Sequence, residues 1–194
     1  VQHNNDDSAL KSLIYNGKHI IKLTGNKNSF ISLIKKMQPI KQPNELQQLC
    51  SLGFYYLYGI NVDKNIGKAL EYFESAAKRG DLTSMIYLGN IYFTGDFFSP
   101  NFEKSRKYFE LASEHEFSYS NLMLGRFYYL GLGVNVDYYK SLKYFEISSK
   151  QNNPNALNLL GNQYCRGLGV EQDYDKARIC YELAAKQRHP SALN

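Results

Sequence analysis

Residues 124–134, with the sequence LGRFYYLGLGV, decide the fold of this chain because their pattern recurs. The pattern is a Leu-Gly pair with Tyr three residues after its Gly and a second Gly six residues after it. It occurs four times, beginning at Leu52, Leu88, Leu124 and Leu160. Each copy begins 36 residues after the one before it. A constant period of this length is typical of proteins that are built from stacked repeats.

The composition is that of a folded protein. The chain has 194 residues, of which 43% are hydrophobic and 21% are charged, and these values lie in the globular range. It contains no apolar run that approaches ~18 residues, the length that predicts a membrane span. The N-terminus is neither basic nor apolar, so we predict no signal peptide. Because the first residue is Val, we interpret the sequence as a fragment of a longer protein.

The three cysteines, Cys50, Cys165 and Cys180, favour a reducing environment. Their number is odd and no two of them form a Cys-x-x-Cys pair, so we predict neither a disulfide framework nor a zinc site. The sequence also lacks an Asn-x-Ser/Thr glycosylation acceptor. We therefore expect a cytoplasmic protein, with the lumen of the endoplasmic reticulum and secretion into a host cell as the alternatives.

The net charge of +5 comes from residues 1–44, which carry seven lysines against Asp6 and Asp7. The favoured interpretation is a solvated capping surface, and the alternative is contact with an anionic membrane surface or an acidic partner. The lysines are scattered and no arginine accompanies them, so nucleic-acid binding is not predicted.

The period divides the chain into repeats. We predict a flexible tail, a divergent N-terminal capping repeat, four full repeats and the start of a further repeat, which cover residues 1–8, 9–44, 45–80, 81–116, 117–152, 153–188 and 189–194 in that order. Terminal repeats are often divergent because one of their faces meets solvent. Residues 189–194 match residues 153–158, so we expect the parent protein to continue into another repeat.

Each full repeat contains two predicted helices, here called helix A and helix B, which are joined by a glycine-marked turn. In the second repeat helix A covers about Thr83–Phe93, and in the third repeat helix B covers Lys140–Lys150. Glycine at the turn suits a positive φ angle at the end of helix A. Asp63, Asp137 and Asp173 follow the turns, where local hydrogen bonding at the start of helix B is favoured over an acid–base role.

Small residues recur where the two helices of a repeat would cross. Gly89 leaves space in helix A, and helix B has Ala or Ser at two recurring positions. These are Ala69, Ser105, Ser141 and Ala177 and, seven residues later, Ala76, Ala112, Ser148 and Ala184. Such residues allow two helices to approach closely. We expect the large rings of Phe73, Phe109, Phe145 and Tyr181 to fill the space between them.

The fourth repeat carries a family pattern. From Ala156 to Ala185 it reads ALNLLGNQYCRGLGVEQDYDKARICYELAA, which closely resembles the Sel1-like repeat family, a relative of the tetratricopeptide repeat. The resemblance implies an all-α fold, namely a right-handed α-solenoid of stacked antiparallel helix hairpins with a 36-residue period. The second repeat departs from the pattern, because the segment Gly95–Pro100 replaces the Gly-x-Gly-Val turn.

The resemblance also implies a class of function. Similar proteins include adaptor subunits of endoplasmic-reticulum-associated degradation, activators of chitin synthases, regulatory regions attached to protein kinases and bacterial proteins aimed at host cells. They share a scaffolding role, so we expect a non-enzymatic adaptor that binds a peptide or protein on the concave helix-A surface. The alternatives are a regulatory or targeting domain of a larger enzyme, such as a kinase or a ubiquitin-ligase complex, and a pathogen effector that binds a host protein.

No residue pattern predicts catalysis, a metal site or a cofactor. His3, His19, His115 and His189 lie far apart and show no metal-ligand spacing or neighbouring nucleophile. The glycines of residues 131–133 follow a predicted helix rather than a strand, so we interpret them as a turn and not as a phosphate-binding loop.

By analogy with tetratricopeptide repeats, the groove-facing residues lie on helix A. They are Thr83, Ile86, Asn90 and Phe93 in the second repeat, Tyr119, Leu122, Arg126 and Tyr129 in the third, and Asn155, Asn158, Asn162 and Arg166 in the fourth. Asn can bond an extended peptide backbone, Arg can bind a carboxylate, and Phe93 and Tyr129 are candidate apolar anchors. The alternative is a solvated helix face whose aromatic residues pack against neighbouring helices. The carboxylate clamp of chaperone-binding relatives is not reproduced, so a chaperone C-terminus is not the expected ligand.

Overall fold

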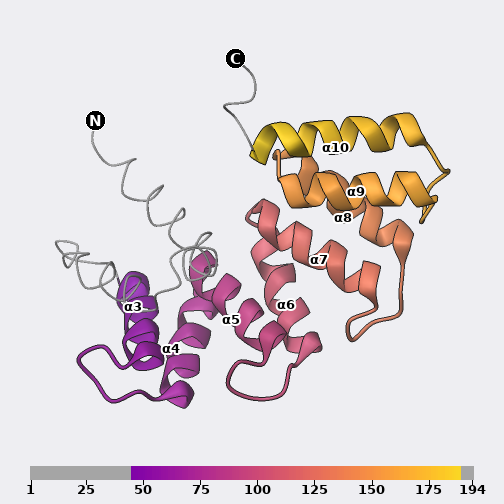
Figure 1. Cartoon of the computed structure of the whole chain (residues 1–194). Helices are drawn as coiled ribbons and strands as arrows, with labels where there is room; N and C mark the ends of the chain where they lie inside the picture. Colours follow the sequence, from indigo (N-terminus) through magenta and orange to yellow (C-terminus); the bar gives the residue numbers. More distant parts are fainter. Residues whose placement is uncertain (1–44, 189–194) are drawn as a thin grey trace, which may run out of the picture. The chain divides into compact units, whose positions relative to one another are not determined.

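The computed structural model describes residues 45–188 of the chain. These residues form eight α-helices and the segments that connect them (Figure 1). They are α3 (Glu45–Tyr58), α4 (Ile66–Lys78), α5 (Leu82–Thr94), α6 (Phe102–Ser113), α7 (Ser118–Leu130), α8 (Tyr138–Lys150), α9 (Pro154–Arg166) and α10 (Tyr174–Arg188). No strand occurs within these residues. The predicted tail, the divergent capping repeat and the start of a further repeat (residues 1–8, 9–44 and 189–194) lie outside the described residues.

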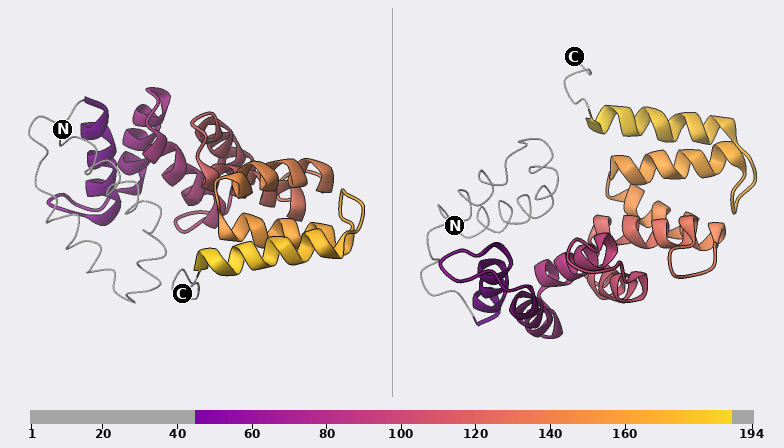
Figure 2. Two further views of the ribbon diagram at one scale, coloured as in Figure 1. Left: turned by 90° about the horizontal axis from the view of Figure 1, so that it is seen from above. Right: turned by 60° about the horizontal axis from the view of Figure 1, so that its bottom comes forward.

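The chain divides into two compact units, residues 1–87 and residues 88–194, and the division falls inside α5. In the first unit α3 packs against α4. In the second unit α7 packs against α8 and α9 against α10, and the pairs are joined because α6 also packs against α7 and α8 against α9. Both views in Figure 2 show α9 and α10 side by side. This is the predicted arrangement of stacked helix hairpins, an α-solenoid.

The helices of one repeat approach closely at the Gly of the Leu-Gly pair. A Cβ atom on Gly53 would lie 2.6 Å from the ring of Phe73. In the other repeats the same glycine faces the equivalent ring, which is that of Phe109, Phe145 or Tyr181. The three phenylalanine rings are fully buried, and Tyr181 is 36% exposed. The prediction that large rings occupy the space left by glycine is confirmed.

The first turn of each helix B is capped by a side chain. The caps are Asn65, Asn101, Asp137 and Asp173, and each accepts a hydrogen bond from the backbone N–H three residues later at 2.8–3.0 Å. They follow the 36-residue period, so the cap of the first repeat is Asn65; the prediction for Asp63 was wrong. The backbone N–H of each cap also donates to the carbonyl oxygen of the repeated Tyr in helix A, at 2.8–2.9 Å. These bonds satisfy end groups of both helices and join them.

A tyrosine pair and a lysine cover this end of the hairpin. The rings of Tyr128 and Tyr144 stack with their centres 5.8 Å apart, and Lys140 Nζ lies 4.3 Å from the centre of the Tyr128 ring. The first two repeats have the equivalent sets Tyr56, Tyr72, Lys68 and Tyr92, Tyr108, Lys104. The repeated Tyr is therefore a packing residue whose ring face attracts a cation.

The Gly-x-Gly-Val turn of the fourth repeat rests on the start of α8, in the repeat before it. A Cβ atom on Gly169 would lie 2.5 Å from the backbone nitrogen of Tyr139. Gly169 also has a φ of +72°, which favours glycine. The buried side chain of Gln163 joins the same elements, because Nε2 donates to the carbonyl oxygens of Tyr138 at 2.8 Å and Leu168 at 3.1 Å. The turn therefore sets how one repeat meets the next.

Candidate functional site

The first helices of the repeats carry little charge. None of α5, α7 and α9 contains Asp or Glu, and their charged side chains are Arg126 and Arg166. The second helices, α6, α8 and α10, carry both acidic and basic residues. In the second unit, helix A therefore presents positive charge alone.

Arg126 lies in the middle of α7 and is half-buried. Its guanidinium carbon is 5.6 Å from the centre of the Phe93 ring, and its Nη1 is 3.8 Å from the sulfur of Met123. The side chain is thus held by a ring face and a thioether. Within residues 45–188 no carboxylate forms an ion pair with it.

Arg166 is the last residue of α9 and is exposed. Gly167 ends the helix with a φ of +66°, so Arg166 lies at the end of the helix dipole that favours a cation. The helix dipole accounts for an arginine at this position. The Arg166 side chain is nevertheless exposed to solvent. None of the carboxylates that the structure describes pairs with it.

Asn90 and Asn162 occupy the repeat position of Arg126, and each accepts a hydrogen bond from a tyrosine. Tyr119 Oη donates to Asn90 Oδ1, and Tyr181 Oη donates to Asn162 Oδ1, both at 2.7 Å. The bond orients the Asn162 amide so that its Nδ2 is the group left to donate. In the described part of the chain Nδ2 of Asn162 has no hydrogen-bond acceptor, and an amide donor of this kind can bond a peptide carbonyl.

Two of the predicted groove residues belong to the core. Leu122 is 4% exposed and Ile86 is 5% exposed, which corrects their assignment to a binding surface. Leu122 is covered because it shares a core cluster with residues of α9 in the next repeat. Of the other predicted residues, Thr83 and Asn158 are half-buried and Asn155 is exposed.

The predicted aromatic residues pack against other rings. Phe93 meets Phe127 edge-on with ring centres 5.7 Å apart, and Tyr129 meets Tyr138 edge-on at 5.6 Å. Both residues are half-buried, as is Tyr119. Part of each ring is accessible to solvent. The rest of the Phe93 and Tyr129 rings packs against other rings, which is the alternative that the sequence analysis named.

Leu130 is a surface residue that the sequence analysis missed. It is the last residue of α7 and is 50% exposed. Leu130 lies one period before Arg166, whereas the residue one period after Tyr129 is Cys165. The predicted set therefore mixed two repeat positions. The counterpart of Arg166 in the third repeat is Leu130, which lies one helical turn beyond Arg126 on the same face.

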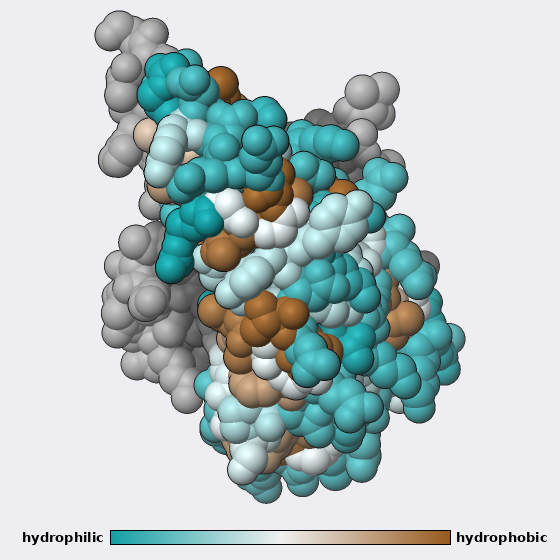
Figure 3. All heavy atoms as spheres, turned by 90° about the vertical axis from the view of Figure 1, so that its right-hand side faces the viewer, coloured by the Kyte–Doolittle hydropathy of each residue, from teal (hydrophilic) through white to brown (hydrophobic). Residues whose placement is uncertain are grey.

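Six accessible residues of α7 and α9 form what we call the helix-A surface: Arg126, Leu130, Asn155, Asn158, Asn162 and Arg166. Spacings of three or four residues place them on one stripe of each helix. Leu122, one turn before Arg126 on α7, shares a core cluster with Ala156 and Leu160 of α9. On the side of the molecule drawn in Figure 3, hydrophobic residues lie in separate patches between hydrophilic ones.

Residues 45–188 contain no group of three or more His, Cys, Asp or Glu side chains that could hold a metal ion. None of their helices combines the length and apolar character needed to cross a membrane. The thiols of Cys50 and Cys180 are free and buried, and burial raises the pKa of both. Because the thiolate is the reactive form, these two cysteines are poor nucleophiles.

A family model described as Sel1 repeat matches four segments of the chain: residues 49–81, 82–117, 118–153 and 154–189. The segments begin one to four residues after the full repeats that the 36-residue period predicts. They cover all the described helices except the first residues of α3.

Two solved structures are similar to this chain over 74% of its length. A protective antigen present in uropathogenic Escherichia coli strains, which displays an SLR fold, shares 29% sequence identity with a TM-score of 0.69. A Sel1 repeat protein from Oxalobacter formigenes shares 28% identity with a TM-score of 0.66. The match covers 31% of the first chain and 59% of the second, so this chain spans only part of their length. The comparison with curated protein sequences gave no match.

Proposed function

Because the chain belongs to the Sel1 repeat family, we propose that it is a non-enzymatic scaffold that binds a peptide or protein partner on the helix-A surface. Sel1 repeats are a non-catalytic type of repeat and generally mediate protein–protein interaction. What favours this particular surface is the way in which each repeat uses its side chains.

One face of helix A is occupied in closing the hairpin. On α7, Gly125 lies against Phe145, and Tyr128 stacks on Tyr144. Arg126 takes no part in these contacts, and the equivalent residue of the fourth repeat is Asn. A position that the hairpin does not require, and that differs in chemistry between repeats, can carry a binding preference specific to this chain.

The groups on the helix-A surface suit recognition of a polypeptide. Asn162 Nδ2 can donate to a backbone carbonyl oxygen, and the two guanidinium groups can bind carboxylates. Leu130 adds an exposed apolar side chain, which can contact an apolar residue of the partner. Together these groups are the observation that carries the proposal: accessible donors and one apolar side chain, which lie on one stripe of α7 and one stripe of α9.

Site-specific photo-crosslinking in cells tests the choice of surface. A photoreactive residue is placed at Leu130 or Asn155 on helix A and, as matched controls, at Lys107 or Ile147 on helix B; all four side chains are exposed. We expect a crosslinked protein from the helix-A positions and none from the helix-B positions. Crosslinks confined to Lys107 and Ile147 would contradict the proposal, because the partner would then lie on the second helices.

A further inference from the structure

We infer that the segment held on the helix-A surface is acidic and that its carboxylates pair with Arg126 and Arg166. This inference rests on the proposed function, since it states the chemistry of the partner for the same surface. It follows from how charge is distributed over the second unit.

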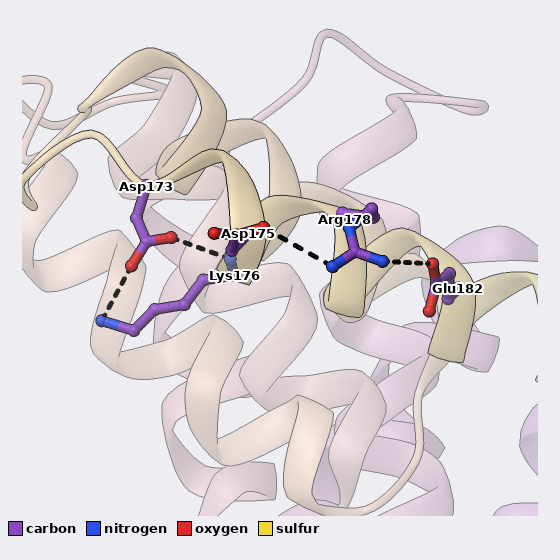
Figure 4. Close-up of polar contacts among 5 residues, drawn as sticks. All are labelled: Asp173, Asp175, Lys176, Arg178 and Glu182. Carbon is purple, nitrogen blue, oxygen red and sulfur yellow. Dashed lines mark hydrogen bonds and ion pairs between the residues drawn. The ribbon is translucent and has the colours of Figure 1, made fainter.

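The acidic residues of the second unit are found on helix B or in connecting segments. Several of them already have cationic partners. On and just before α10, Lys176 Nζ lies 3.2 Å from Asp173, and Arg178 lies 3.5 Å from Asp175 and 3.4 Å from Glu182 (Figure 4). These ion pairs of α10 are local, because each joins residues three or four positions apart.

The first helices lack this compensation. Arg126 and Arg166 are the charged residues of α5, α7 and α9, and no carboxylate within residues 45–188 pairs with either. A surface of one charge attracts a partner of the opposite charge and disfavours one of the same charge. A basic segment would meet two uncompensated cations here, whereas an acidic segment would neutralise them.

Arg126 is positioned before the partner arrives. The Phe93 ring and the Met123 sulfur restrict its side chain, so less conformational entropy is lost when it binds. A guanidinium can form two parallel hydrogen bonds to one carboxylate, and such bonds are stronger than those between neutral groups. Nη1 of Arg126 contacts the Met123 sulfur, and because a guanidinium has five N–H donors, others are left to bind a carboxylate.

The neighbouring residues narrow the chemistry further. Leu130 lies one turn beyond Arg126 and is half exposed, so it can contact an apolar side chain. The amide of Asn162 can bond the backbone of an extended segment. The expected ligand is an extended acidic peptide that carries at least one apolar residue near its carboxylates.

Selection from a library of short random peptides tests this chemistry with the full chain as bait. We expect the selected peptides to be enriched in Asp and Glu. Their affinity should fall roughly tenfold or more in the double variant Arg126→Gln/Arg166→Gln, because two charge-assisted contacts are lost. Binding should also weaken as salt concentration rises. The matched control is Lys107→Gln/Lys150→Gln, which removes the same charge from exposed positions of helix B and should leave the affinity unchanged.

Charge reversal gives a second readout that does not depend on loss of binding. The variant Arg126→Glu/Arg166→Glu should select peptides enriched in Lys and Arg, with its folding checked by circular dichroism. Selected peptides without acidic enrichment, or acidic peptides that bind the double Gln variant as tightly as the wild type, would overturn the inference and leave the proposed function standing. No selected peptide at all, together with crosslinks from helix B alone, would overturn both.

Discussion

At Gly125 a single absent side chain sets the distance between α7 and α8. A Cβ atom there would lie 2.5 Å from Cδ1 of Phe145, whose ring is fully buried. We expect Gly125→Ala to lower the free energy of unfolding by about 1–3 kcal/mol, because the added methyl group must displace a closely packed ring. Urea unfolding followed by circular dichroism measures the change.

Gly67→Ala is the matched control for Gly125→Ala. Gly67 is an exposed residue near the start of α4, and its added Cβ would approach only Asn65 Oδ1, at 3.4 Å. Replacement of an exposed helical Gly by Ala is stabilising by about 0.5–1 kcal/mol. Equal unfolding midpoints for Gly125→Ala and the wild type would contradict the close contact of α7 with α8.

The corrected cap of the first repeat makes a second prediction at the scale of single residues. Asn65 accepts a hydrogen bond from the Lys68 backbone N–H at 3.0 Å, whereas Asp63, in the same turn, is not the cap. Asn65→Ala should therefore cost about 1 kcal/mol of unfolding free energy. Asp63→Ala should change it by less than about 0.5 kcal/mol. If chemical denaturation showed a larger loss of stability for Asp63→Ala than for Asn65→Ala, Asp63 would be the cap after all.

At the scale of helices and turns, the contact between the last two repeats depends on Gln163. Its amide donates to the carbonyl oxygens of Tyr138 and Leu168, and the side chain is fully buried. We expect Gln163→Leu to cost about 1–3 kcal/mol, because two partly buried carbonyl groups lose a donor. Thermal unfolding should show a lower midpoint.

An exposed glutamine in the following segment provides the comparison. Gln172 also donates from Nε2 to a backbone carbonyl, that of Cys165 at 2.8 Å, but its side chain is exposed. Water can replace its bond, so Gln172→Leu should change stability by less than about 0.5 kcal/mol. A similar loss of stability in Gln163→Leu and Gln172→Leu would mean that burial of the glutamine does not determine the size of the effect.

At the scale of the whole chain, the described helices should differ in local stability. In the second unit α7 packs against α6 and α8 and shares a core cluster with α9, whereas α10 packs against α9 and exposes Ile179 and Leu183. Amide hydrogens in helices with more buried contacts exchange more slowly. Hydrogen–deuterium exchange read by mass spectrometry should therefore show stronger protection in α7 than in α10. Equal protection would indicate that the second unit opens as one cooperative block.

The hairpins could be predicted because their determinants lie close together in the sequence. The Leu-Gly pair, the turn glycine, the helix-B cap and the ring opposite the glycine all fall within one period, and they recur in every full repeat. The two errors of register, Asp63 for Asn65 and Arg166 in the position of Tyr129, arose where the period was not applied strictly. Both could have been avoided with the sequence alone.

The sequence by itself determined the repeat unit, its two helices, the turn between them and the family to which the chain belongs. Only the tertiary structure decided which helix-A side chains reach the surface. Leu122 and Arg126 lie one turn apart on α7, yet Leu122 is buried beneath residues of α9 and Arg126 is not. The physical reason is that accessibility at these positions is set by how the next repeat packs, and a pattern contained within one repeat does not specify that packing.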